Sequence, residues 1–200
     1  MGRVADKTFK EKLNSLILAK EKFGVIVVDE YQGITKYKEA EGPRLMIVNL
    51  AQNTVLARIA KSEHAVCWNI CYFPGYEQTD NSEKTKVKGH PRHLMLPPSA
   101  RTIVKPKPNV FEQSYPSFDQ EVENSGITAA IVMGYATNGC VADCIAGTNH
   151  LLPTYSDGHG DGLVGRGIEV HTHSALLRGD GGNPKGWEKR DKVFFYEKFG

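Results

Sequence analysis

The chain has little of what marks several classes of protein. Its 200 residues include only four cysteines, too few for a disulfide scaffold, so a reducing, cytoplasmic setting is expected. The net charge is only +2, which disfavours nucleic acid or a membrane surface as a partner chosen by charge. No apolar run approaches the roughly 18 residues that a membrane span needs. Residues 1–7 carry no apolar stretch after their charges, so no signal peptide is predicted.

What is present is the composition of an ordinary globular domain. Hydrophobic residues make up 40% of the chain and charged residues 24%. A chain of this length suffices for one domain with its own core and is short for two. Because no repeat or linker divides it, we expect a single domain over residues 1–200.

Apolar runs alternate with segments of helical spacing along the chain. Runs such as Val25–Val28 have no polar alternation, which is typical of strands buried on both faces of a parallel sheet. Helices are expected over residues 5–22, from Pro43 onward, and over residues 118–124 and 140–152. Strands are expected over residues 25–28, 64–73, 102–104, 127–133, 168–172 and 193–197. The pattern predicts an α/β fold, a three-layer α/β/α sandwich with a mostly parallel six-stranded sheet.

Three chemically active side chains follow three of the predicted strands. Asp29 comes directly after the first strand, Lys105 ends the third, and Cys140 heads the helix after the fourth. Ligands of open parallel sheets bind beyond the carboxyl ends of the strands, so these side chains are expected to meet there. A helix N-terminus and a nearby ammonium both favour the thiolate, which is the form of cysteine that attacks. A carboxylate can accept the thiol proton and later deliver it to a leaving group.

Three motifs around these residues occur in order: Val27-Val28-Asp29, a lysine at 105 with Phe111 six residues on, and Gly134 to Val141 in the pattern Gly-x-x-Thr-x-x-Cys-Val. Together they resemble the isochorismatase-like cysteine hydrolases, which include nicotinamidases and carbamoylsarcosine amidases. The resemblance covers roughly residues 23–200. It implies a six-stranded parallel sheet between helices, in agreement with the pattern of strands.

The resemblance also implies roles for individual residues. Cys140 is implied as the nucleophile, Asp29 as the general base and Lys105 as its charged partner. A cis peptide between Tyr135 and Ala136 is implied, with the backbone N–H groups of Ala136 and Cys140 forming an oxyanion hole. Homo-oligomerisation, as a dimer or tetramer, is implied as well.

The chain departs from the family pattern at two places near the expected site. Tyr31, followed by Gln32, stands where members often carry a glutamine two residues after the aspartate. The Asp-x-His metal ligands of nicotinamidases are missing after the second strand, so we predict no metal and no cofactor and disfavour nicotinamide as substrate. The loop over residues 153–167 is longer than usual and is a candidate lid or subunit contact.

The retained Cys140 indicates C–N chemistry, since true isochorismatases cleave a vinyl ether and typically lack this cysteine. The predicted function is a cysteine hydrolase that cleaves an amide or carbamoyl bond of a small molecule through a thioester. Two alternatives stay open: an isochorismatase-type or other non-amide hydrolase, and a catalytically inactive binding or assembly module.

Other side chains admit both a functional and a structural interpretation. Aromatic residues that could line a substrate pocket, or belong to the core, are Tyr31, Trp68, Tyr72, Phe111 and Tyr135. Cys144 lies one helical turn after Cys140, as a redox partner or, more in keeping with a buried thiol, as core packing. His171 and His173 alternate on a strand and could reach the pocket, a neighbouring subunit or local hydrogen-bond partners.

Overall fold

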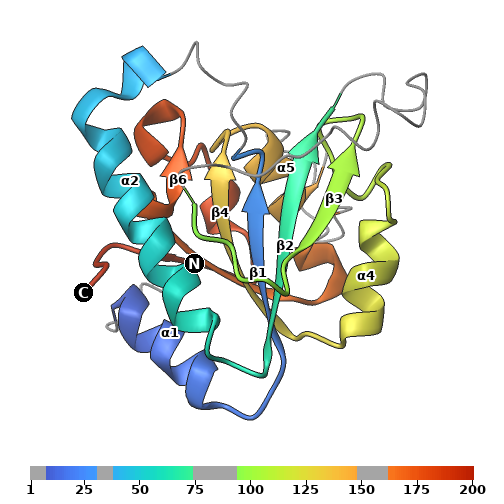
Figure 1. Ribbon diagram of the computed structural model, residues 1–200. Coiled ribbons are helices and arrows are strands. Elements are labelled where there is room, and N and C mark those ends of the chain that lie inside the picture. Colours follow the sequence, from blue (N-terminus) through green and yellow to red (C-terminus); the bar gives the residue numbers. More distant parts are fainter. Residues whose placement is uncertain (1–7, 31–37, 74–93, 148–161) are drawn as a thin grey trace.

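The fold is known from a computed structural model, which describes residues 8–30, 38–73, 94–147 and 162–200, with only the backbone over residues 38–43. The described residues form one sheet with helices on both faces (Figure 1). The predicted α/β class and the mostly parallel sheet are therefore confirmed.

The sheet is parallel throughout, with the strand order β3-β2-β1-β4-β5-β7 and β6 paired beside β4. All six predicted strands are present. A seventh, β6, was not predicted, because two residues are too short to carry a pattern. The bounds are β1 (Phe23–Val28), β2 (Ala65–Tyr72), β3 (Arg101–Lys105), β4 (Ala129–Tyr135), β5 (Glu169–His173), β6 (Leu177–Arg178) and β7 (Val193–Tyr196).

The helices are α1 (Phe9–Leu18), α2 (Lys38–Ile59), α4 (Phe118–Ser125) and α5 (Cys140–Ala146). The prediction that Pro43 opens the second helix is wrong. That helix begins five residues earlier, in a polar stretch without the apolar spacing on which the prediction depended. The helix that starts at Cys140 is shorter than predicted because Gly147, with φ of 87°, ends it. Within the described ranges, every helix is too short or too polar to traverse a bilayer.

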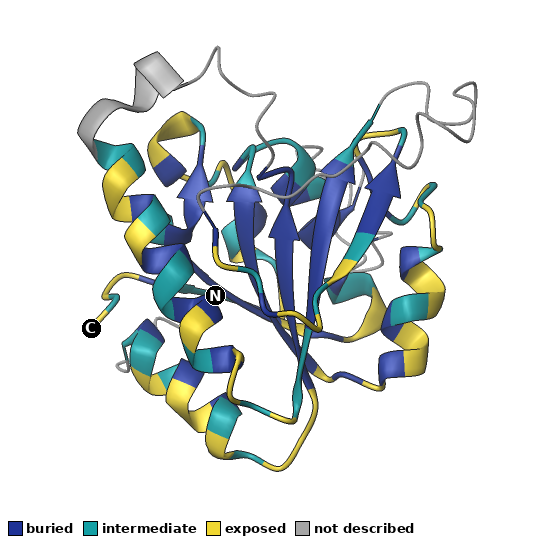
Figure 2. Cartoon of the chain, in the orientation of Figure 1, coloured by how far each residue is buried: buried dark blue, intermediate teal, exposed yellow. Residues whose placement is uncertain are grey.

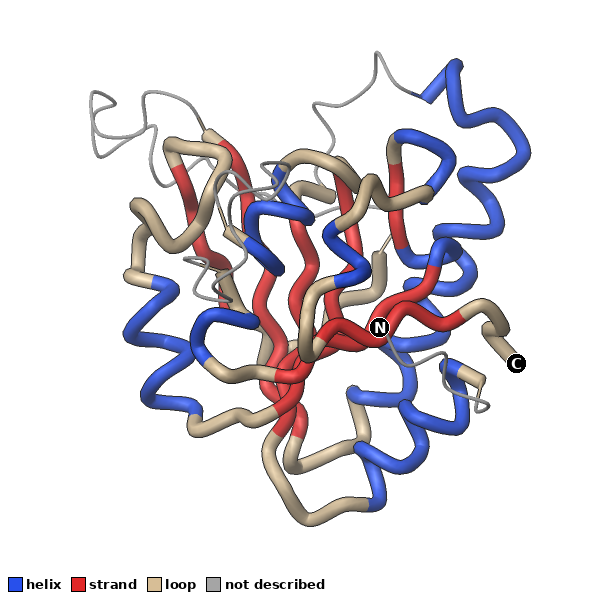
Figure 3. The backbone as a smooth tube through the Cα atoms, turned by 180° about the vertical axis from the view of Figure 1, so that it is seen from behind, coloured by secondary structure: helices blue, strands red, loops and turns tan. Residues whose placement is uncertain are grey.

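The central strand β1 supplies both faces of the sheet with core residues. Val25 and Val27 pack with α1 and α2, whereas Ile26 and Val28 pack with α4 and α5. This alternation follows from the two-residue period of a strand. Figure 2 shows the strands buried between partly exposed helices, and the view from behind in Figure 3 shows helices covering the opposite face. The three-layer arrangement is thus built from two hydrophobic cores that share one sheet.

Candidate active site

Asp29 and Lys105 form a buried ion pair at the carboxyl edge of the sheet. The Lys105 Nζ atom lies 2.9 Å from an Asp29 carboxylate oxygen, and both side chains are almost wholly buried. Asp29 follows β1 directly, and its backbone N–H continues the ladder to the Ile70 carbonyl at 2.8 Å. The Lys105 ammonium group also donates a hydrogen bond to the Pro108 carbonyl at 2.5 Å. The Lys105 ammonium group is therefore held by two partners, the turn after β3 and the Asp29 carboxylate.

Cys140 completes a group of three interacting side chains. It is the first residue of α5, and its half-buried thiol interacts with both the Asp29 carboxylate and the Lys105 ammonium. The three residues come from segments that follow β1, β3 and β4, with β2 between the first two strands in the sheet. The structure thus brings these three side chains together at one edge of the sheet, and their catalytic roles stay predictions.

The electrostatics differ from the expected stable thiolate. Burial first, and the neighbouring Asp29 carboxylate second, raise the pKa of the Cys140 thiol from 9.0 to about 12, against the opposing effect of Lys105. Burial raises the pKa of Asp29 above its usual 3.8, although Lys105 acts in the other direction. Burial alone would lower the pKa of Lys105, but Asp29 and Cys140 together raise it. The raised pKa of Cys140 favours a protonated thiol at rest beside the Asp29–Lys105 pair.

The segment from Gly134 to Gly139 contains the last two residues of β4 and the loop that joins this strand to Cys140. Gly134 has a φ of 128°, and a Cβ atom there would collide with the backbone of Val28 in β1, so only glycine fits. The peptide bond between Tyr135 and Ala136 is cis. Thr137 is buried, and its hydroxyl donates to the carbonyls of Arg178 and Gly179, each at 2.8 Å. The start of the loop is thus fitted tightly against β1 and the segment after β6.

Two of the aromatic candidates, Tyr72 and Tyr135, lie next to Lys105 and to the cis peptide, respectively. The Lys105 Nζ atom lies 5.3 Å from the centre of the Tyr72 ring, at the end of β2. Tyr135 is half-buried, directly before the cis peptide, and an added Cβ at Gly179 would lie 3.2 Å from its ring. Tyr31 lies outside the described residues.

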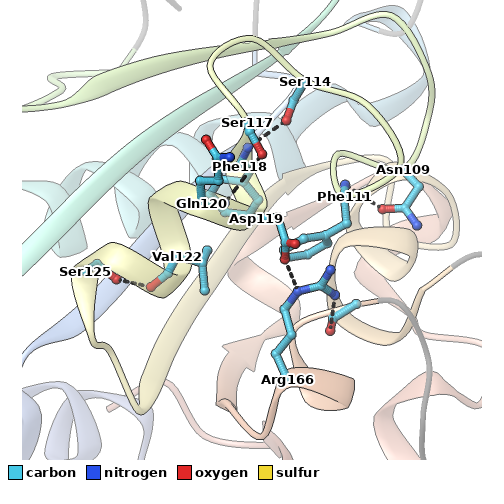
Figure 4. A network of polar contacts seen from close by, with 11 residues as sticks. Asn109, Phe111, Ser114, Ser117, Phe118, Asp119, Gln120, Val122, Ser125 and Arg166 are labelled. Carbon is cyan, nitrogen blue, oxygen red and sulfur yellow. Dashed lines mark hydrogen bonds and ion pairs between the residues drawn. The ribbon is translucent and has the colours of Figure 1, made fainter.

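The other two candidates lie elsewhere. Trp68 is fully buried and pairs with Arg101, the first residue of β3, whereas the ion pair lies at the last. Its indole donates to Glu121 at 3.2 Å, and this contact supports the core interpretation of Trp68 over the pocket role. The Phe111 ring lies 5.0 Å from that of Phe118, and the Arg166 guanidinium covers it at 3.7 Å (Figure 4). Phe111 is thus held in a packing contact with α4.

Cys144, His171 and His173 have structural surroundings. Cys144 is buried in the core between the sheet and the helices α4 and α5. His171 stacks on Phe194, with ring centres 4.9 Å apart, and its Nδ1 atom lies 3.2 Å from the Tyr196 hydroxyl. His173 accepts a hydrogen bond from the Ala175 N–H at 2.9 Å. These contacts support the structural interpretation of both histidines.

A second buried ion pair, which the sequence did not reveal, adjoins the first. Glu30 follows Asp29 directly, and its carboxylate lies 2.6 Å from the Arg178 guanidinium. Gln52 of α2 donates to the other carboxylate oxygen at 2.9 Å and to the Leu176 carbonyl at the same distance. All three side chains are buried. Arg178 ends the two-residue strand β6, so no pattern in the sequence could have placed it beside Glu30.

Within the described ranges, no group of three or more histidine, cysteine or acidic side chains has the arrangement of a metal site. The absence of a metal or cofactor and the homo-oligomeric state stay predictions. The same holds for the role of the 153–167 loop, which lies largely outside the described residues.

Comparison with known proteins connects this geometry to solved structures. No family model and no curated protein matches the sequence. The fold is similar to that of an isochorismatase-like hydrolase from Alkaliphilus metalliredigens, with a TM-score of 0.57 and 13% identity, covering 89% of this chain and 95% of that one. An N-carbamoylsarcosine amidase from Thermoplasma acidophilum gives a TM-score of 0.57 at 15% identity, covering 89% and 96%.

A further similar structure is described as a MAR1 ribonuclease from Leishmania major, with a TM-score of 0.50 and 17% identity. The match covers 79% of this chain and 65% of that longer chain. At such identities the likeness concerns the fold. The sheet order, the site at its carboxyl edge and these matches together show that the chain has the fold of the isochorismatase-like hydrolases.

Proposed function

We propose that the protein is a cysteine hydrolase that cleaves a C–N bond of a small amide or carbamoyl compound. The observation that carries the proposal is the convergence of Cys140 with the buried Asp29–Lys105 ion pair. A buried pair of this kind next to a thiol is the arrangement that nucleophilic catalysis needs: a nucleophile, a base, and a group that orients the base. The names of the similar amidase and hydrolase structures agree with this reaction class.

The first half of the reaction transfers the substrate's acyl group to sulfur. Because the pKa of the Cys140 thiol is about 12, the thiol proton passes to Asp29 as the sulfur attacks the carbonyl carbon. The raised pKa of Asp29 suits a carboxylate that must hold this proton for a time. The C–N bond then breaks, Asp29 protonates the departing nitrogen, and ammonia or an amine leaves behind a thioester on Cys140.

The second half returns the enzyme to its starting state. Asp29 removes a proton from water as the water oxygen attacks the thioester carbon, and the carboxylic acid product leaves while Cys140 regains its proton. Lys105 keeps its positive charge throughout and stabilises the carboxylate form of Asp29. The oxyanion of each tetrahedral intermediate is assigned to the backbone N–H groups of Ala136 and Cys140. The Cys140 N–H belongs to the first turn of α5, where N–H groups lack intrahelical acceptors.

The test is ammonia release from a panel of small amides and carbamoyl compounds, with the Cys140→Ala variant as control. We expect release that this variant abolishes, and an adduct of acyl mass on Cys140 after rapid acid quenching. Hydrolysis of a vinyl ether without such an adduct would favour the non-amide hydrolase. If no compound reacts and iodoacetamide modifies only Cys67, Cys71 or Cys144, the catalytically inactive module becomes the better account.

A further inference from the structure

Asn138 has all the hydrogen-bonding capacity of its side chain engaged by one distant segment. It lies in the loop between the cis peptide and Cys140. Its Nδ2 atom donates to an Asp180 carboxylate oxygen and to the Asn183 carbonyl, each at 2.9 Å. Its Oδ1 atom accepts from the Lys185 N–H at 2.7 Å and from the Trp187 indole N–H at 3.1 Å. An amide side chain has two donors and two acceptor sites, so every one is used.

The segment that Asn138 binds, residues 180–187, is itself anchored in the protein. The Trp187 side chain is fully buried in the core that also contains Val141 and Ile145 of α5. Its ring packs edge-on against Phe195 of β7, with centroids 6.3 Å apart. Of the four partners of Asn138, Trp187 therefore belongs to the core, whereas Asp180, Asn183 and Lys185 are exposed.

This attachment lies where small displacements matter for the proposed reaction. Asn138 follows the buried Thr137 and precedes Gly139, which is the N-cap of α5 and provides no side-chain cap for the helix. The Gly139 N–H donates to the Ala136 carbonyl at 2.9 Å, which is an acceptor within the same loop. Misplacement of a reacting atom by about 1 Å can lower a rate by about 100-fold. Thr137 is anchored to Arg178 and Gly179, and the 180–187 segment adds a second anchor one residue nearer to Cys140.

We infer that Asn138 is a positioning residue that holds the Cys140 sulfur and the Ala136 N–H in register with Asp29. The inference rests on the proposed function, because it concerns the same nucleophile. Residues 180–187 thereby take part in the site through Asn138, and not through a contact with Asp29, Lys105 or Cys140.

The test exchanges donor and acceptor between Asn138 and Asp180. Asn138→Asp replaces two donors with a carboxylate facing that of Asp180, while keeping an acceptor for Lys185 and Trp187. Asp180→Asn in the same chain restores a donor opposite that carboxylate. Asp180 has a φ of 51°, a conformation that asparagine adopts as readily as aspartate, so the exchange suits the backbone.

The probe is p-nitrophenyl acetate, which acylates an activated cysteine and releases nitrophenolate whatever the natural substrate is. We expect Asn138→Asp to slow the Cys140-dependent burst by about 10- to 100-fold. The double variant should recover at least about fivefold of that loss, since directly bonded residues do not behave additively. A general loss of stability would reduce the burst amplitude, through the folded fraction, and would leave the rate constant of the folded fraction unchanged.

Asn53→Asp is the matched control, because this half-buried α2 residue also accepts a backbone hydrogen bond, from the Met95 N–H at 2.8 Å, and keeps that acceptor. Its burst rate should equal that of the unaltered protein. An unchanged rate in Asn138→Asp, or no recovery in the double variant, overturns the inference and leaves the proposed function standing. If the unaltered chain shows no burst that Cys140→Ala removes, both the inference and the proposed function fail.

Discussion

Two acidic residues that are neighbours in the chain, Asp29 and Glu30, form ion pairs of opposite character. Each carboxylate is buried and paired with one cation, Lys105 at 2.9 Å and Arg178 at 2.6 Å. The first pair has a half-buried thiol beside it. The second is closed by the buried amide of Gln52. The first pair therefore has a group with which to exchange a proton, whereas the second joins α2, β1 and β6 as a structural link.

The difference shows why burial of charge alone is a poor guide to function. The pKa of Asp29 is raised, because its burial outweighs the attraction of Lys105. Perturbed pKa values gather at functional sites, but structural ion pairs can be buried just as deeply. What separates the two pairs here is the neighbouring side chain: a thiol beside the first pair, and beside the second an amide whose nitrogen donates two hydrogen bonds.

The largest effect should come from Asp29→Asn, which removes the base while keeping the shape of the side chain. Hydrolysis of any amide found active in the panel should slow by about 10²- to 10⁴-fold, the contribution of a positioned general base. The measurement is kcat under saturating substrate. Glu30→Gln is the matched control and should keep kcat within about threefold, measured well below its unfolding temperature. Equal losses in the two variants would erase the proposed distinction.

The next effect concerns stability and should appear at the second pair. Arg178→Met leaves the Glu30 carboxylate buried without its cation, and the free energy of unfolding should fall by about 3–5 kcal/mol. Lys105→Met should cost less, since the raised pKa of Asp29 allows that carboxyl to take up a proton instead. Urea unfolding at neutral pH measures both. Adding Glu30→Gln to Arg178→Met should restore part of the stability, and a double variant less stable than Arg178→Met would contradict the pairing.

The smallest effect is the pH dependence contributed by the thiol beside the first pair. In the folded protein the pKa of Cys140 is about 12 instead of 9.0, so the folded state keeps a proton that the unfolded chain loses. This contribution to stability is present below about pH 9 and is lost as the pH rises toward 12. Cys140→Ser should make the fall in unfolding free energy between pH 8 and 11 slightly shallower. Cys67, Cys71 and Cys144 also have raised pKa values, and their contributions are present in both proteins. A steeper fall in the Cys140→Ser variant than in the unaltered protein would contradict the prediction.

The sequence predicted the parts of the molecule that depend on strong local patterns. Unbroken apolar runs gave the six longer strands, and their carboxyl ends gave Asp29, Lys105 and Cys140. The raised thiol pKa was not predictable, because it depends on how deeply the folded chain buries the sulfur. Glu30 could be read only as a residue at a strand end, since its partner Arg178 follows an unpatterned segment almost 150 residues later.

Asn138 illustrates the same limit at the scale of a single side chain. It stands inside the most specific motif of the sequence, yet its partners lie 42 to 49 residues further on, in short irregular turns. Trp68 is the opposite case, in which a candidate pocket residue lies in the middle of β2, four residues before Tyr72, and pairs with the first residue of β3. Distance along a strand, which is fixed at about 3.3 Å per residue, decided between pocket and core.

Residues 180–187 anchor the loop between β4 and Cys140, and this has a consequence for the order in which the protein matures. A ribosome synthesises Asp29, Lys105 and Cys140 well before it reaches Trp187. A nascent chain can therefore hold all three side chains of the site while the segment that fixes the loop is still within the ribosomal tunnel. On this view, a fragment that stops before residue 180 would carry every residue of the proposed chemistry and still acylate slowly, so that competence arrives only with the late part of the chain.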